Sequence, residues 1–452
     1  MERQPIVVEG LTPSVGSASG TEIGTRSAST ALLASRWWQL GLGIAAMVMI
    51  ASPQYIWALF TRPVTQALGA TLAQVQVTFS ILIVVQTFLS PAQGLLVDRF
   101  GPRLLLSIGT ALSGLSWVLA AQTTSLTGFY LTYGLLGGIG TGIVYVGVVG
   151  HMVQWFPDRR GLATGFVAAG YGMGALLFTF PVSNAIERAG YRDAMWTFGL
   201  VFGLAGIVVA QGLRRPAAGS AVGPRSAVAR VVDVRPAQML RTPVFWLLFL
   251  MMTMMSTSGL MVTSQMGAFT ADFGMAGVLV WGLPLLPLAL SIDRITNGAT
   301  RPFFGWVSDR IGRENTMFIA FALEAVAMTL WLLLREHPVM FVLMSGLVFF
   351  GWGEIFSLFP STLTDTFGTA HATTNYGLLY MAQGVGSVLG GPVAALLHEW
   401  TQSWIPVFAT IIAMDATTAV LALFVLKPVR QRWLAGGLNA QGSMPNAQRG
   451  LE

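Results

Sequence analysis

The chain has no cysteine among its 452 residues, and its single lysine is Lys427. Without cysteine it cannot form disulfide bonds, thiolate metal sites or a cysteine nucleophile. Without another lysine it cannot form the GxxxxGK loop that binds nucleotide phosphates in many ATPases. The four histidines lie far apart in the sequence, at positions 151, 337, 371 and 398. We therefore expect no metal site, no cofactor and no enzymatic active site.

Charge is scarce as well. Asp, Glu, Lys and Arg make up 10% of the residues, whereas 54% are hydrophobic. The apolar residues form runs long enough to cross about 30 Å of hydrocarbon as helix. The composition therefore predicts an all-α membrane protein that spans a lipid bilayer many times. The net charge of +6 comes mainly from arginines in short loops, as is usual on the cytoplasmic side of a membrane, and we expect no nucleic-acid partner.

Hydropathy along the chain predicts twelve membrane-spanning helices. Their approximate ranges are 37–60, 72–97, 104–121, 126–155, 162–186, 195–213, 245–269, 278–307, 317–334, 339–363, 376–397 and 404–426. The predicted organisation is a disordered cytoplasmic tail (1–36), a six-helix half (37–213), a cytoplasmic linker rich in Pro, Ala, Gly and Arg (214–242), a second six-helix half (243–427) and a cytoplasmic C-terminal tail (428–452). Both termini are expected inside, because most loop arginines fall on that side.

A short motif with the spacing GxxxDRxG occurs twice, at residues 94–103 after the second predicted span and at residues 305–313 after the eighth. Its glycines permit a sharp turn, and its Asp and Arg could exchange partners when two halves of a carrier move. A single copy could equally be a solvated charged turn, but the repetition favours gating. The predicted gating residues are Gly94, Asp98, Arg99, Gly101 and Arg103 in the first copy and Gly305, Asp309, Arg310, Gly312 and Arg313 in the second.

The repeated motif resembles that of the major facilitator superfamily of transporters. Four further stretches resemble the oxalate:formate antiporter family within it: residues 155–165 (WFPDRRGLATG), 169–172 (AGYG), 300–305 (TRPFFG) and 375–377 (NYG). The resemblance implies two pseudo-symmetric six-helix halves, exchange of small carboxylates such as oxalate and formate by alternating access, and a bacterial inner membrane. We expect a monomer.

Arg301 is the predicted substrate anchor. It precedes Asp309 by eight residues, which places it about 12 Å deeper in the membrane if the segment is helical. A guanidinium stays charged and can hold a carboxylate with two parallel hydrogen bonds. In the family that the chain resembles, the matching arginine binds the substrate carboxylate. The alternative is a structural role, in which Arg301 neutralises Asp293 or Glu354.

Several aromatic and amide residues match pocket positions of that family: Gln54, Tyr55, Tyr145, Tyr171, Trp352, Tyr380 and Gln383. Packing between helices is the alternative for any one of them. Gln383 stands where oxalate:formate exchangers have a lysine, so a dianion would meet one positive charge unless Arg294 supplies a second. Arg294 lies two helical turns before Arg301 on the same predicted face, and pairing with an acid is equally open for it.

Three more acids lie within predicted spans, at Glu324, Glu354 and Asp415. Glu354 follows Trp352 closely and is a candidate proton carrier, or else a fixed partner of Arg301 or Arg294. Glu324 and Asp415 could simply satisfy neighbouring helices. A proton-coupled monocarboxylate symporter that uses Glu354 is therefore the main alternative to an exchanger. A membrane receptor or assembly subunit without transport is a further alternative.

Overall fold

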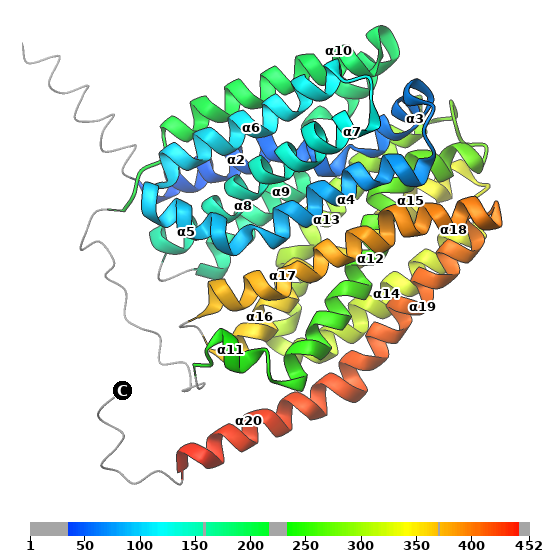
Figure 1. Cartoon of the computed structure of the whole chain (residues 1–452). Coiled ribbons are helices and arrows are strands. Elements are labelled where there is room, and N and C mark those ends of the chain that lie inside the picture. The colour runs from blue at the N-terminus through cyan, green and yellow to red at the C-terminus, as the bar shows by residue number, and fades with distance from the viewer. Residues whose placement is uncertain (1–34, 157–159, 217–232, 369–370, 443–452) are drawn as a thin grey trace, which may run out of the picture.

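The computed structural model describes residues 35–156, 160–216, 233–368 and 371–442. The tail 1–34, the middle of the predicted linker and the last ten residues, 443–452, lie outside the described residues, and the predictions for them stay predictions. We call residues 35–216 the first segment and residues 233–442 the second segment. Figure 1 shows the helices of the first segment in the upper part of the molecule and most helices of the second segment below them.

The first segment is helical throughout most of its length. Its elements are α2 (Arg36–Tyr55), α3 (Ala58–Leu68), α4 (Leu72–Phe88), α5 (Ser90–Phe100), α6 (Pro102–Gln122), α7 (Leu126–Phe129), the π-helical turn η1 (Tyr130–Leu136), α8 (Gly137–Trp155), α9 (Arg160–Gly174) and α10 (Leu176–Gln211). Thr71 and Gln74 start α4 with reciprocal side-chain caps. Gly190 kinks α10 with a φ of 87°, which a glycine adopts without steric strain.

The second segment adds one short hairpin to its helices. Its elements are α11 (Pro236–Met239), α12 (Pro243–Asp272), β1 (Leu279–Val280), β2 (Leu283–Pro284), α13 (Leu285–Ile311), α14 (Arg313–Leu333), α15 (Pro338–Trp352), α16 (Ile355–Phe367), α17 (Ala372–Val388), η2 (Leu389–Val393), α18 (Ala394–Thr401), α19 (Ile405–Leu421), η3 (Ala422–Leu426) and α20 (Lys427–Gly442). α20 extends the last predicted span into the predicted C-terminal tail.

The predicted start of the eighth span is wrong. Residues 279–284 form a two-residue antiparallel pairing in place of helix, with Val280 opposite Leu283. Trp281 and Gly282 connect the strands with φ values of 52° and 81°. Positive φ at both central residues is the geometry of a tight hairpin turn. The helix therefore begins at Leu285, directly after Pro284.

Within the described residues, eight helices are long and apolar enough to cross a membrane, or up to ten if each of two bent pairs is one span. The bent pairs are α2 with α3, at 45°, and α4 with α5, at 53°. α13 is not among these candidates, because it carries Asp293, Arg294 and Arg301 within its length. The chain is thus an all-helical membrane protein whose most charged long helix lies among apolar ones.

Glycines allow helices of the two segments to approach closely. A Cβ at Gly298 of α13 would lie 2.0 Å from Met173 Cγ of α9, and one at Gly267 of α12 would lie 2.2 Å from the carbonyl oxygen of Ala58 in α3. Any side chain at these positions would collide with the neighbouring helix. α13 therefore packs directly on α9, with α15 of its own segment on another side. This position brings the arginines of α13 to the interface between the segments.

Candidate functional site

Arg301 reaches from the second segment to the first. Its side chain is 3% exposed, and it donates hydrogen bonds from Nη1 to the carbonyl oxygen of Ala168 on α9 and from Nη2 to Oδ1 of Asn297, at 3.1 Å. The guanidinium lies 4.5 Å from the ring centre of Phe356. Gly172 of α9 leaves room for it, since a Cβ there would be 3.0 Å from Nη2. Arg301 is thus held in one orientation by groups from both segments.

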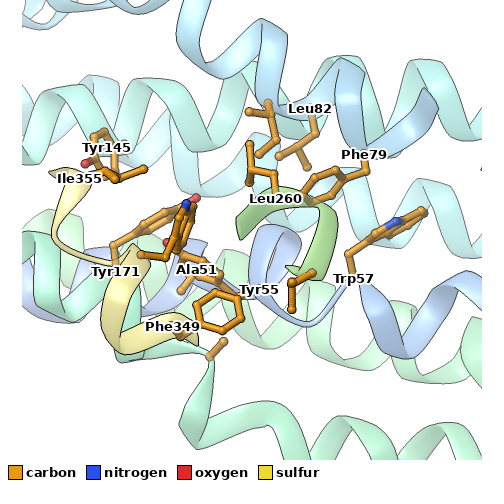
Figure 2. Close-up of a cluster of buried hydrophobic side chains, with 14 of the residues drawn as sticks. Ala51, Tyr55, Trp57, Phe79, Leu82, Tyr145, Tyr171, Leu260, Phe349 and Ile355 are labelled. Carbon is orange, nitrogen blue, oxygen red and sulfur yellow. The ribbon is translucent and has the colours of Figure 1, made fainter. Parts of the chain in front are cut away.

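Arg294 lies between two aromatic rings. Its Cζ is 4.3 Å from the ring centre of Tyr55 on α2 and 4.4 Å from that of Phe349 on α15, and the residue is fully buried. Figure 2 shows these two rings in one buried cluster with Tyr171. None of the three guanidinium nitrogens has a hydrogen-bond partner among the described residues. A buried charge with unpaired donors is unfavourable, so Arg294 is suited to an anionic ligand.

Four tyrosines form a continuous series across the interface. Tyr55 contacts Tyr171 with a ring separation of 5.2 Å, and Tyr171 contacts Tyr145 at 5.1 Å. Tyr145 on α8 then stacks on Tyr380 of α17, with ring centres 5.7 Å apart and planes inclined by 6°. All four predicted tyrosines therefore come together beside the arginines, three from the first segment and one from the second.

Amide side chains from both segments belong to the predicted site. The hydroxyl of Tyr171 donates to Oε1 of Gln54 at 2.7 Å and accepts from Nε2 of Gln86 at 3.4 Å. Nε2 of Gln54 and Nδ2 of Asn297 are buried donors without a partner among the described residues. Gln383 of α17 is 1% exposed, and its Oε1 likewise has no such partner. The site thus combines two guanidinium groups with several amide groups that are free to bind a ligand.

Trp352 lies behind the two phenylalanines of the site. Its Nε1 donates to the carbonyl oxygen of Met255 at 2.8 Å, so its only donor is already used. Its ring contacts Phe349 and Phe356, each at 5.4 Å. The structure therefore places Trp352 as a support for the rings that lie against Arg294 and Arg301.

The buried acids do not form ion pairs with these arginines. Among the described residues, no ion pair within 4.0 Å joins Arg294 or Arg301 to a carboxylate. Asp293 and Glu354 are both fully buried; Asp293 interacts electrostatically with Arg294, and Glu354 with Arg301. The arginines are therefore available to an external anion.

The second copy of the repeated motif forms an ionic network at the end of α13. Arg313 pairs with Asp309 at 2.8 Å and with Asp365 of α16 at 2.9 Å. Arg310 lies over the ring of Trp306, 3.6 Å from its centre. The turn into α14 uses Gly312, whose φ is 89°, and open space surrounds Gly305. The motif therefore connects α13 to α16 through charged groups near the surface.

The first copy has a similar turn with different contacts. Gly101 separates α5 from α6 with a φ of 95°, and Nε of Arg103 donates to Oε1 of Gln211 at 2.9 Å. Arg99 lies over the ring of Phe100, and Gly94 faces Val146 on α8. The side chain of Asp98 lies outside the described residues. Both copies thus use glycine in the left-handed region at the corresponding position, as the motif predicts.

Sequence reasoning assigned no role to four contributors to the site: Gln86, Asn297, Phe349 and Phe356. Gln86 had a signal, because it is an amide inside an apolar span. Asn297 had one too, since it lies between the two arginines at helical spacing. No sequence feature distinguishes Phe349 and Phe356 from other residues, because phenylalanine is common on every face of a membrane helix.

Comparison with known proteins shows the family of the chain. The Major Facilitator Superfamily model matches residues 40–293 and 287–442. The oxalate:formate antiporter of Oxalobacter formigenes is 36% identical over 409 residues, covering 89% of this chain and 95% of that protein. The uncharacterized MFS-type transporter YhjX of Escherichia coli (strain K12) is 28% identical, covering 78% of this chain and 86% of that protein, and monocarboxylate transporter 13 of Bos taurus is 26% identical, covering 74% and 75%. The chain belongs to the Major Facilitator Superfamily, a family of secondary transporters and not of enzymes.

Proposed function

We propose that this protein exchanges small carboxylates across the membrane by alternating access, with oxalate and formate as its substrate pair. The observation that carries the proposal is the pair of buried arginines on α13. Arg294 has three unpaired nitrogens, and Nε of Arg301 is also without a partner among the described residues. The similarity to an oxalate:formate antiporter supports the substrate class.

We also infer twelve membrane spans in two six-helix halves. Among the ten candidate spans, α9 and α10 together form one unit of 50 residues, although Gly190 kinks this unit. α13 is not a candidate because of its charges. Splitting that unit and adding α13 gives twelve spans. The excess of loop arginines on one side supports cytoplasmic termini, and the organism of the most similar relative named above supports a bacterial inner membrane.

In the proposed site Arg301 binds one carboxylate with two donors, and Arg294 supplies the second positive charge for a dianion. Seven residues separate them, about 10 Å along the helix axis, so a dicarboxylate would lie lengthwise along α13. The tyrosines flank the ligand and exclude water, which strengthens each charged hydrogen bond. Nε2 of Gln54 and Nδ2 of Asn297 provide N–H donors for its remaining oxygens, whereas the free Oε1 of Gln383 can only accept a hydrogen bond.

Exchange follows from the same charges. An empty carrier must move with one or two buried arginines uncompensated, which is unfavourable in a low-dielectric interior. A bound anion removes that penalty, so the loaded carrier reorients faster than the empty one. Return of the carrier therefore requires a second anion on the opposite side.

The test is uptake of labelled oxalate into proteoliposomes that contain the purified protein and either formate or buffer alone. We expect uptake only with internal formate, and loss of uptake in Arg301→Gln. Arg335→Gln is the matched control, because Arg335 is a loop arginine that pairs at 3.7 Å with the exposed Glu336. Rapid oxalate uptake without any internal anion would contradict exchange.

The same assay distinguishes the alternatives. Entry of formate or lactate driven by an inward proton gradient, with no oxalate exchange, would favour a monocarboxylate symporter, which the similarity to monocarboxylate transporter 13 makes the second candidate. No flux of any carboxylate from folded protein would indicate a receptor or assembly subunit.

A further inference from the structure

A second buried polar cluster lies inside the second segment, away from the tyrosines. It consists of Ser258 on α12, Glu324 on α14 and Asp415 on α19, and all three residues are fully buried. The hydroxyl oxygen of Ser258 lies 2.9 Å from Oε1 of Glu324 and 2.9 Å from Oδ2 of Asp415. We call these residues the acid pair and its bridging serine.

The number of hydrogens in this cluster favours a proton on a carboxyl group. A serine hydroxyl has one hydrogen, which forms one linear hydrogen bond or is shared weakly between two acceptors. Ser258 has two equally short contacts with carboxyl oxygens. Both contacts are satisfied when one of Glu324 and Asp415 is a neutral carboxylic acid that donates to Ser258.

No cation among the described residues balances the acid pair. Oε2 of Glu324 and Oδ1 of Asp415 have no hydrogen-bond partner there, and no arginine, lysine or histidine of the described chain pairs with either acid. The described residues also contain no group of three His, Cys, Asp or Glu side chains suited to a metal ion. The ligand that this chemistry accepts is a proton.

Glu354 connects the acid pair to the anion site. It lies at the break between α15 and α16, fully buried, and neither carboxyl oxygen has a partner among the other described residues. Two glycines beside it mark its neighbours: a Cβ at Gly351 would lie 2.8 Å from Cβ of Glu324, and one at Gly353 would lie 2.8 Å from Oδ1 of Asn297, which accepts from Arg301. Glu354 interacts electrostatically with Glu324, Asp415 and Arg301. This unpartnered side chain is a second observation, independent of the serine bridge.

The other charged groups on the surrounding helices are few. α15 has no titratable side chain, and the single one on α12, Asp272, contacts His398 and Trp404 at the far end of that helix. On α13, Arg301 interacts with Glu354, whereas Asp293 and Arg294 interact mainly with each other. The charged groups that interact with Glu354 are therefore Arg301 and the other two buried acids.

We propose that Glu324, Ser258 and Asp415 form a proton-binding site and that Glu354 links it to Arg301, so that an anion binding at Arg301 is accompanied by proton uptake. The positive charge of Arg301 favours a negative charge on Glu354. A bound carboxylate cancels that positive charge, and one of the three neighbouring carboxylates then takes a proton from a hydronium ion: one O–H bond breaks, a water molecule leaves, and one O–H bond forms on the carboxyl group. By linkage, acid conditions in turn favour anion binding. The proton-binding site is inferred from the two contacts of Ser258 with Glu324 and Asp415, whereas its link to transport rests on the proposed function.

Infrared spectroscopy of the purified protein tests the proton site alone. At neutral pH we expect the C=O stretching band of a buried carboxylic acid, and its loss or shift in Glu324→Gln and in Asp415→Asn. Asp365→Asn is the control, since Asp365 is an exposed partner of Arg313. Absence of a carboxylic acid band in the unaltered protein would overturn the proposal without any variant.

Transport tests the link. We expect a lower pH on both sides of the membrane to lower the half-saturating oxalate concentration for exchange severalfold, and this change to vanish in Glu324→Gln and Asp415→Asn. A change of the same size in both folded variants, or none in the unaltered protein, would overturn the link. If no carboxylate is transported at all, the proposed function fails, and the infrared result still decides whether the proton site exists.

Discussion

Gly172→Ala tests whether the space around Arg301 matters for binding. The added Cβ would lie 3.0 Å from Nη2 and 3.2 Å from Cζ of Arg301, and 3.4 Å from Oδ1 of Asn297. Carbon contacts are most favourable at about 3.5–4.0 Å, so the guanidinium must move by several tenths of an ångström. It cannot move freely, because Ala168 holds Nη1 and the ring of Phe356 lies 4.5 Å from the guanidinium.

The size of the effect follows from this crowding. Overpacking of a well-packed site costs about 1–3 kcal/mol, and about 1.4 kcal/mol corresponds to a tenfold change in an equilibrium constant. We therefore expect Gly172→Ala to raise the half-saturating oxalate concentration for exchange about tenfold, because the displaced guanidinium of Arg301 is no longer aligned to form two hydrogen bonds with the carboxylate. The measurement is initial exchange rate against oxalate concentration in proteoliposomes.

The matched control is Gly165→Ala on the same helix. A Cβ at Gly165 meets nothing within 4 Å, so this variant adds the same methyl group and the same gain in helix propensity without touching Arg301. Equal half-saturating concentrations in the two variants, with both proteins folded, would refute the assignment of Gly172 as the space for the anchor.

Two further substitutions probe the surroundings of the arginines. In Gly259→Ala the new Cβ would lie 2.1 Å from Cε2 of Trp352, so we expect a loss of about 1–3 kcal/mol of stability and a lower unfolding temperature, measured by intrinsic fluorescence in detergent. In Arg294→Gln a buried charge without hydrogen bonds is removed, so we expect equal or higher thermal stability together with a half-saturating concentration that rises about tenfold or more for oxalate and less for formate.

Each of these predictions has its own check. Gly41→Ala adds a methyl group where nothing lies within 4 Å, and it should leave the unfolding temperature unchanged. If Gly259→Ala unfolds at the same temperature as this control, the contact with Trp352 is less tight than its geometry implies. For Arg294→Gln, an equal change for oxalate and formate would show that Arg294 does not distinguish dianions from monoanions.

The helical architecture could be predicted from the sequence because a bilayer admits few alternatives. Apolar runs of sufficient length become helices, and the predicted spans fall on helical segments of the structure, although the fifth and sixth spans share α10 across its kink at Gly190. The start of the eighth span was the exception, since the apolar residues 278–284 look helical by hydropathy alone. The chain reverses direction there because of the backbone angles at Trp281 and Gly282, which hydropathy does not record.

The candidate site was only partly accessible to the same reasoning. Arg294 and Arg301 stand out because charge inside an apolar helix is rare. The position of Arg294 between Tyr55 and Phe349 could not be predicted, because it depends on how three distant helices pack. The serine bridge between Glu324 and Asp415 was hidden for the same reason, and only the structure shows that these two acids are neighbours.

The distribution of buried charge has an electrical consequence. Among the described residues, every buried Asp, Glu and Arg side chain belongs to the second segment. A transmembrane voltage acts on charge within the bilayer by about 2.3 kcal/mol per elementary charge for each 100 mV crossed. In the proposed mechanism, the membrane potential therefore acts almost entirely on the second segment when the two segments move relative to each other. The segment that carries Arg294 and Arg301 would then also be the one that responds to voltage.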